Sequence, residues 1–177
     1  MADYPGGLEE HWEAGGERLT IRPIRPPDAA AHDAFFHRLS PEDVRHRFFV
    51  AMRELSPAQL ARFTRPDYER DMAFIAVRER TGETVGVARL AHAEDDPMVG
   101  EFAVVVQQDV RGRGLATHLM RRLIEWAPRH GLRQVVGEIL ADNRQMLALA
   151  RRLGFRLQHS ADDAGVIEAW LSLPGPA

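Results

Sequence analysis

Among its 177 residues the chain has no cysteine and no lysine, and it has 23 arginines. The absence of cysteine excludes disulfides, thiolate-bound metals and a cysteine nucleophile, and predicts a reducing, cytoplasmic compartment. The absence of lysine excludes a P-loop, whose phosphate-binding pattern requires one. No apolar run approaches the roughly 18 residues of a membrane span, and the polar N-terminus is unlike a signal peptide. We therefore expect a soluble protein with no membrane partner.

The bulk composition is that of an ordinary globular domain, with 45% hydrophobic and 28% charged residues. The formal net charge of −3 gives no reason to expect a nucleic-acid partner. No cluster of histidine and carboxylate residues has metal-ligand spacing, so we expect no metal. We expect one domain over residues 19–173, with a loose lead-in over 1–18 and a tail over 174–177.

Hydrophobic periodicity predicts a mixed α/β (α+β) domain. Seven strands are expected over residues 19–25, 72–77, 84–92, 99–107, 132–140, 155–159 and 166–173. Helices are expected over residues 26–39, from 40, over 56–63, over 115–127 and over 143–153. This order of elements predicts a mixed sheet with helices on both faces.

The most informative segment is residues 104–116, where an apolar strand enters a turn containing Gly112 and Gly114 and then opens onto an amphipathic helix. Such a turn aims backbone N–H groups and the positive end of the helix dipole at one point, and glycine lets phosphates approach the main chain. The segment therefore predicts a pyrophosphate site. A dinucleotide fingerprint is disfavoured, because Thr117 stands where its third glycine is required.

Two segments carry a family resemblance. Residues 111–116 read Arg-Gly-Arg-Gly-Leu-Ala and resemble the Arg/Gln-x-x-Gly-x-Gly/Ala acetyl-CoA motif of the GNAT superfamily of N-acetyltransferases. Residues 143–155 resemble that family's helix after the fifth strand, which begins with asparagine and ends at Gly-Phe. In physical terms Asp142 or Asn143 can cap this helix and Gly154 can end it.

The resemblance covers roughly residues 19–173, which is nearly the whole chain. It implies a GNAT-like, mostly antiparallel sheet of about seven strands whose fourth and fifth strands splay apart. It implies acetyl-CoA as co-substrate, with the backbone N–H of Val104 or a neighbour as oxyanion donor and with Arg111 and Arg113 holding phosphates. The residues expected to bind acetyl-CoA are Val104, Val106, Arg111, Gly112, Arg113, Gly114, Leu115, Ala116 and Asn143.

Glu101 is the candidate general base. It shares one face of its strand with Ala103 and Val105, and it precedes the Gly-rich turn by about 17–20 Å of extended chain. That length is comparable with an extended pantetheine arm, which would bring a thioester beside Glu101. In many enzymes of the family a glutamate on the fourth strand acts as base, often through a water. Without the resemblance, a solvated surface glutamate is the simpler interpretation.

The chain departs from the family at the general acid. Many relatives carry a tyrosine five residues before the Gly-Phe phenylalanine, where this chain has Ala150. A thiolate leaves readily near neutral pH, since a thiol has a reference pKa of about 8.5. Water or Tyr68 are the substitutes that the sequence offers.

Within the family the chain is more similar to the acetyltransferase domain of bacterial protein lysine acetyltransferases that act on acyl-CoA synthetases. The matching phrases lie at residues 24–28, 39–49, 67–76 and 100–104. The resemblance implies a protein lysine as acceptor, and a monomer or homodimer. Two alternatives remain: a small-molecule amine N-acetyltransferase, and a non-catalytic acyl-CoA-binding sensor.

Overall fold

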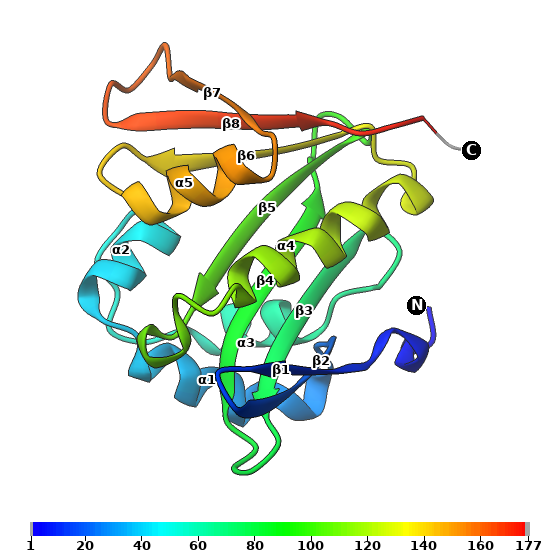
Figure 1. Ribbon diagram of the computed structural model, residues 1–177. Helices are drawn as coiled ribbons and strands as arrows, with labels where there is room; N and C mark the ends of the chain where they lie inside the picture. The colour runs from blue at the N-terminus through cyan, green and yellow to red at the C-terminus, as the bar shows by residue number, and fades with distance from the viewer. Residues whose placement is uncertain (1, 176–177) are drawn as a thin grey trace.

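The computed structural model describes residues 2–175, which form one eight-stranded sheet in the order β1-β2-β3-β4-β5-β6-β8-β7 (Figure 1). All neighbouring strands are antiparallel except the parallel pair β5–β6. The strands are β1 Glu10–Ala14, β2 Glu17–Pro23, β3 Asp71–Arg78, β4 Thr84–His92, β5 Val99–Val106, β6 Gln134–Leu140, β7 Arg156–His159 and β8 Val166–Ser172. The predicted mixed, mostly antiparallel fold is confirmed, with one strand more than the expected seven.

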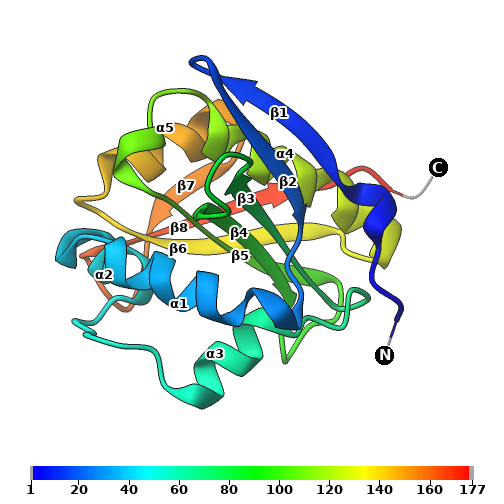
Figure 2. The ribbon, with the colours of Figure 1, turned by 90° about the horizontal axis from the view of Figure 1, so that it is seen from below.

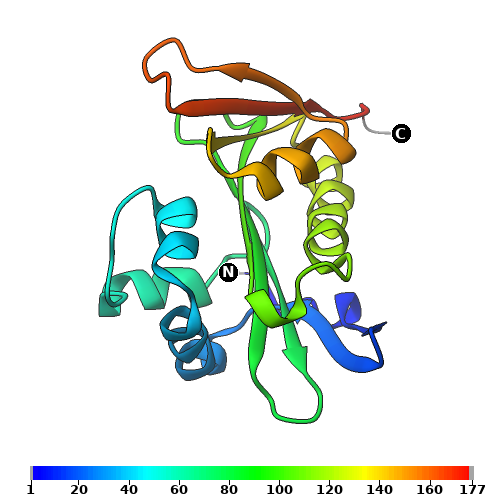
Figure 3. The same ribbon diagram turned by 60° about the vertical axis from the view of Figure 1, so that its left-hand side comes forward.

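Helices cover both faces of this sheet, as expected. In the described residues they are α1 Ala29–Arg38, α2 Pro41–Phe48, α3 Pro57–Thr64, α4 Leu115–Trp126 and α5 Arg144–Arg152. Helices α1, α2 and α3 lie on one face, and α4 and α5 lie on the other (Figures 2 and 3). None of these helices is long and apolar enough to cross a membrane.

Local sequence accounts for where the helices begin. The hydroxyls of Ser40 and Ser56 each accept a hydrogen bond from the backbone N–H three residues on. The side chains of Asp43 and Gln59 in turn accept one from the backbone N–H of Ser40 and Ser56. These capping boxes, each followed by a proline, satisfy N–H groups that the first turn leaves free. In α4 the predicted stripe of Leu115, Leu119, Leu123 and Trp126 is buried against the sheet.

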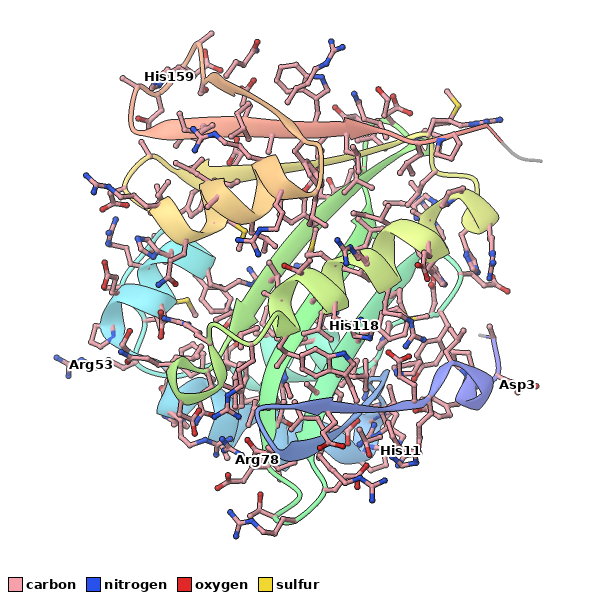
Figure 4. All side chains as sticks on the ribbon, viewed as in Figure 1. Asp3, His11, Arg53, Arg78, His118 and His159 are labelled. Atoms are coloured by element: carbon pink, nitrogen blue, oxygen red, sulfur yellow. The ribbon has the colours of Figure 1, made fainter. Side chains whose placement is uncertain are left out.

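The N-terminal segment is not the loose lead-in that we expected over residues 1–18. Strand β1 pairs with β2 through a hairpin whose Gly15 and Gly16 both have positive φ. Trp12 stacks on His118 of α4 with ring centroids 5.3 Å apart, and His118 also contacts Glu10. Figure 4 shows His118 on α4 beside this hairpin. The expectation of a loose segment is wrong, because the contacts that hold this segment in place come from a helix about a hundred residues away in the sequence.

The other end of the chain differs little from expectation. Strand β8 ends at Ser172, and residues 173–175 of the described chain follow it without regular structure. Of the expected tail over 174–177, residues 176–177 lie outside the described residues.

The parallel pair β5–β6 is short. Only three residue pairs join the two strands, the last being Glu101 with Val136, although β5 continues to Val106 and β6 to Leu140. Beyond Glu101 the strands diverge, which confirms the predicted splay. The divergence leaves a gap inside an otherwise continuous sheet, and this gap positions the candidate site.

Candidate functional site

A cavity of about 950 Å³ opens where β5 and β6 separate. Its walls come from the C-terminal halves of these two strands, the turn that follows β5, the first turn of α4, one side of α5, and α2. Its volume falls at the upper end of the range of ligand pockets, about 300–1,000 Å³. Of the predicted acetyl-CoA residues, eight line it: Val104, Val106, Arg111, Gly112, Gly114, Leu115, Ala116 and Asn143.

The splay directs backbone donors into this cavity. The carbonyl of Val99 and the N–H of Gln107 both bond to the β4 side of β5. Because backbone groups alternate sides along a strand, the N–H groups of Val104 and Val106 point the other way, toward β6. Both residues lie beyond the last β5–β6 pair, so their N–H groups face the cleft.

The Gly-rich turn has the geometry that its sequence predicts. Gly112 and Gly114 have φ of +76° and +83°, values that L side chains adopt at a cost. A Cβ at either position would meet nothing within 4 Å, so the space above both glycines is open. Gly114 is the N-cap of α4 and offers no side-chain acceptor, which leaves the first-turn N–H groups free for an anion.

The two arginines of the turn have different surroundings. Arg111 lines the cavity, and its guanidinium donates to the carbonyl of Val106 at 2.9 Å and to Asp43 at 2.6 Å. It thereby ties the turn to the end of β5 and to the first turn of α2. Arg113 does not line the cavity. It donates to Glu17 at 3.0 Å, beside the β1–β2 turn, so its predicted phosphate contact stays a prediction.

Helix α5 supplies cationic residues that the sequence analysis missed. Asn143 caps this helix, as predicted, by accepting a bond from Met146 N–H at 3.1 Å. Arg144, Ala148 and Arg152 follow at i, i+4 spacing and all line the cavity. The sequence signal for them is this i, i+4 spacing on the helix face opposite the apolar stripe.

An ion pair lies beside the cavity, which His46 and Asp142 line. On α2, Arg45 donates to Asp142 at 2.6 Å, and His46 lies 3.2 Å from the same carboxylate. Asp142 immediately precedes the cap of α5, so this contact joins helices on opposite faces of the sheet. The hydrogen bond from Arg45 lowers the pKa of the exposed Asp142 carboxyl.

Glu101 does not belong to the cavity wall. It lies at the last β5–β6 pair, is exposed to solvent, and points to the α1–α3 face, which Ala103 and Val105 share. Val104 and Val106 pack on the opposite, α4 face. Glu101 therefore lies at the apex of the splay, where a ligand threaded between the strands would emerge.

No tyrosine in the described residues lines the cavity. Ala150 is buried in α5, and the hydroxyl of Tyr68 donates to the carbonyl of Ile24 at 2.8 Å. Tyr68 is therefore committed to the core beside Tyr4, whose hydroxyl donates to Pro23. The structure offers neither as a general acid.

Comparison with known families decides the class. Residues 18–156 match the model of the acetyltransferase (GNAT) domain. The chain belongs to the GNAT acetyltransferase family. As a GNAT acetyltransferase it has a fold that binds acetyl-CoA, and the cavity, its free N–H groups and its open glycines suit that ligand.

Individual relatives agree with this assignment. An acetyltransferase of Pseudomonas aeruginosa is 38% identical over 160 residues, covering 88% of this chain and 86% of its own. The L-methionine sulfoximine/L-methionine sulfone acetyltransferase of the same species is 28% identical over 179 residues, covering 98% and 87%.

Solved structures show the same fold. The GNAT domain of Streptomyces lividans PAT superposes with a TM-score of 0.88 at 26% identity, covering 97% of this chain and all of that domain. An acetyltransferase of Salmonella typhimurium, solved with acetyl-CoA, gives a TM-score of 0.71 at 22% identity, covering 90% and 96%.

Proposed function

We propose that this acetyltransferase transfers the acetyl group directly to a primary amine within a ternary complex, with Glu101 as the general base. The position of Glu101 at the apex of the splay carries the proposal. From Glu101 to the end of β5 at Val106, the cleft follows about 17 Å of extended strand, and the Gly-rich turn lies beyond it. Acetyl-CoA bound along it supplies an activated thioester carbonyl to the acceptor.

The proposed roles follow from where the groups lie. The first turn of α4, with the N–H groups at Leu115 and Ala116, receives the phosphates, and Arg111 and Arg152 add positive charge. The N–H of Val104 donates to the carbonyl oxygen as negative charge develops on it. Glu101, directly or through a water, takes the proton that the amine must lose.

The reaction balances without a redox partner. A C–N bond forms between the acceptor nitrogen and the acetyl carbon, and the C–S bond breaks. One proton passes from the nitrogen toward Glu101, and the thiolate leaves and takes a proton from solvent. Since a thiol has a pKa near 8.5, the reaction does not require a tyrosine at position 150.

For the acceptor, we propose a protein lysine side chain, of the kind presented by acyl-CoA synthetases. The resemblance of the sequence phrases and the likeness to the GNAT domain of S. lividans PAT support this choice. A small amine is the second candidate, supported by the methionine sulfoximine relative and by two half-buried arginines near Glu101, Arg47 and Arg89. A cytoplasmic location and a monomeric or homodimeric state remain predictions.

The test is release of CoA thiol from acetyl-CoA, with a purified acyl-CoA synthetase and with a panel of amines, by wild type and Glu101→Gln. We expect the substitution to lower kcat by about 10²- to 10⁴-fold with acetyl-CoA affinity unchanged. Binding of acetyl-CoA with no transfer to any acceptor would favour the non-catalytic sensor instead. Full activity of Glu101→Gln would remove Glu101 from the mechanism.

A further inference from the structure

A cationic residue lies beside Glu101 on the same face of the sheet. In the β4–β5 ladder Ala91 pairs with Glu101 and Arg89 pairs with Ala103. Because paired residues share a face, Arg89 is the diagonal neighbour of Glu101, at a typical separation of about 7–8 Å in an antiparallel sheet. Glu101 and Arg89 are therefore diagonal neighbours on the face of the sheet that α1 and α3 cover.

A second cation reaches this point from α2. Arg47 lines the main cavity, and it also borders a small cavity of about 20 Å³ together with Arg89. The two cavities share Arg47, Phe48, Ala103 and Val105, so they adjoin. The guanidinium carbons of Arg47 and Arg89 lie 5.8 Å and 5.0 Å from the centre of the same Phe63 ring.

Neither guanidinium has a counter-ion. Within residues 2–175 no carboxylate lies within 4.0 Å of Arg47 or Arg89. Arg89 donates to the Phe63 carbonyl, and Asp71, whose charge does act on Arg89, lies beyond ion-pair distance. Burial and the neighbouring cations lower the pKa of Arg89 to about 9 and that of Arg47 to about 10.

Other shielded arginines of the chain are paired. Arg22 holds Asp28 at 2.6 Å, and Arg78 contacts three carboxylates. His32 borders the same small cavity as Arg47 and Arg89, and its buried Nδ1 has no hydrogen-bond partner in the described residues. Two desolvated cations without an anion are costly to keep, and stacking on Phe48 and Phe63 offsets only part of that cost.

We propose that Arg47 and Arg89 form a carboxylate subsite, which orients a small amino-acid-type acceptor with its amine toward Glu101. The inference rests on the proposed acetyltransferase function and favours its second acceptor class. Guanidinium groups match a carboxylate in shape and charge and bind it through paired hydrogen bonds. With Glu101 adjacent, the site presents opposite charges to the two ends of a zwitterion.

The test compares amines that differ only in the carboxylate, such as L-phenylalanine with phenethylamine and L-lysine with cadaverine. With acetyl-CoA saturating, we expect kcat/KM to favour the amino acid of each pair by about 10- to 100-fold, mostly through KM. Arg47→Met and Arg89→Met should bring the ratio close to one. Arg47→Lys and Arg89→Lys should retain part of it, because the charge remains.

Arg62→Met is the matched control. Arg62 is an exposed cation of α3 whose charge acts on both arginines, but it borders neither cavity. This variant should keep the wild-type ratio. Calorimetric titration of the same amino acids into the CoA-saturated protein gives a readout independent of turnover, and their affinity should fall in both methionine variants.

The outcomes separate the two proposals. Equal kcat/KM for both members of each pair, or a preference that survives in Arg47→Met and Arg89→Met, overturns the subsite and leaves the acetyltransferase function standing. Transfer to a protein lysine, with no amino acid bound or acetylated, also overturns the subsite and leaves the acetyltransferase function standing. Amino-acid binding that depends on both arginines, without transfer to any acceptor, supports the subsite and overturns the proposed function.

Discussion

The ring of Phe102 on β5 fills the space in which a side chain at Gly137 on β6 would begin. A Cβ built on Gly137 would lie 2.5 Å from Cε1 of Phe102, and the ring packs edge-on against Phe155 at 5.1 Å. Phe102 also lines the cavity. The residue that fills the gap between the diverging strands is therefore part of the wall of the site.

Gly137→Ala tests this relationship. The added methyl group has no room, so either the ring or β6 must shift, and we expect unfolding free energy to fall by about 1–3 kcal/mol. Acetyl-CoA affinity should fall with it, as measured by calorimetric titration. Phe102→Leu combined with Gly137→Ala should recover part of both losses. Wild-type stability and affinity in the single variant would show that the splay does not depend on this contact.

Gly114→Ala separates backbone strain from ligand binding. At φ +83° an alanine costs about 1–2 kcal/mol. Its methyl group would project into the open space above the Gly-rich turn at residues 111–116, which we call the cradle. Gly82, in the β3–β4 turn, has φ +75° and equally open surroundings but lies outside the cavity. Both alanine variants should lose similar stability in urea unfolding, and only Gly114→Ala should also weaken acetyl-CoA binding. Equal affinity in the two would argue against phosphate binding at the cradle.

Sequence reasoning predicted the parts of this molecule that depend on local chemistry. The seven expected strands, the Ser40 and Ser56 caps and the buried stripe of α4 all follow from periodicity and from neighbours within one turn. The backbone geometry of the cradle was predictable for the same reason, because glycine in a turn favours the positive φ that Gly112 and Gly114 adopt. The family resemblance then supplied the splay, which no local pattern encodes.

Contacts between distant segments were not predictable in this way. Strand β1 was missed although Gly15 and Gly16 join two alternating segments, a pattern typical of a two-residue hairpin turn. Arg113 looked identical to Arg111 in the motif, yet Glu17, 96 residues away, pairs with it. The position of Arg47 beside Arg89 likewise depends on how α2 packs over the sheet, which the sequence of α2 does not specify.

The arginines of the cradle and of α5 should respond differently to substitution. Arg152 lines the cavity and donates to Thr117 at 3.4 Å, whereas Arg113 is paired with Glu17 outside it. We expect Arg152→Met to raise the Kd of acetyl-CoA by about three- to tenfold at low salt, with a smaller effect in 0.5 M salt. Arg113→Met should leave that Kd unchanged. A higher Kd in Arg113→Met and an unchanged Kd in Arg152→Met would show that Arg113, and not Arg152, contacts the phosphates.

His32 gives the fold a specific dependence on pH. Its ring is buried beside Phe35 and Phe63, and burial, followed by the charges of Arg89 and Arg47, lowers its pKa from 6.5 to about 4. Asp28 and Asp33 act in the opposite direction without reversing the shift. The unfolded chain therefore takes up a proton at this histidine between pH 6.5 and 4, and the folded chain does not.

Stability due to His32 is consequently present above pH 6.5 and is lost as the pH falls to 4, by on the order of 3 kcal/mol over the whole window. His32→Leu removes the titrating group and fits the apolar surroundings, so the unfolding free energy of the variant should fall less over that range. Urea unfolding at pH 7, 6, 5 and 4 measures the difference. His159→Gln, at an exposed position on β7 far from this cluster (Figure 4), should follow wild type. Parallel curves for wild type and His32→Leu would mean that His32 gains its proton in the folded state at an ordinary pH.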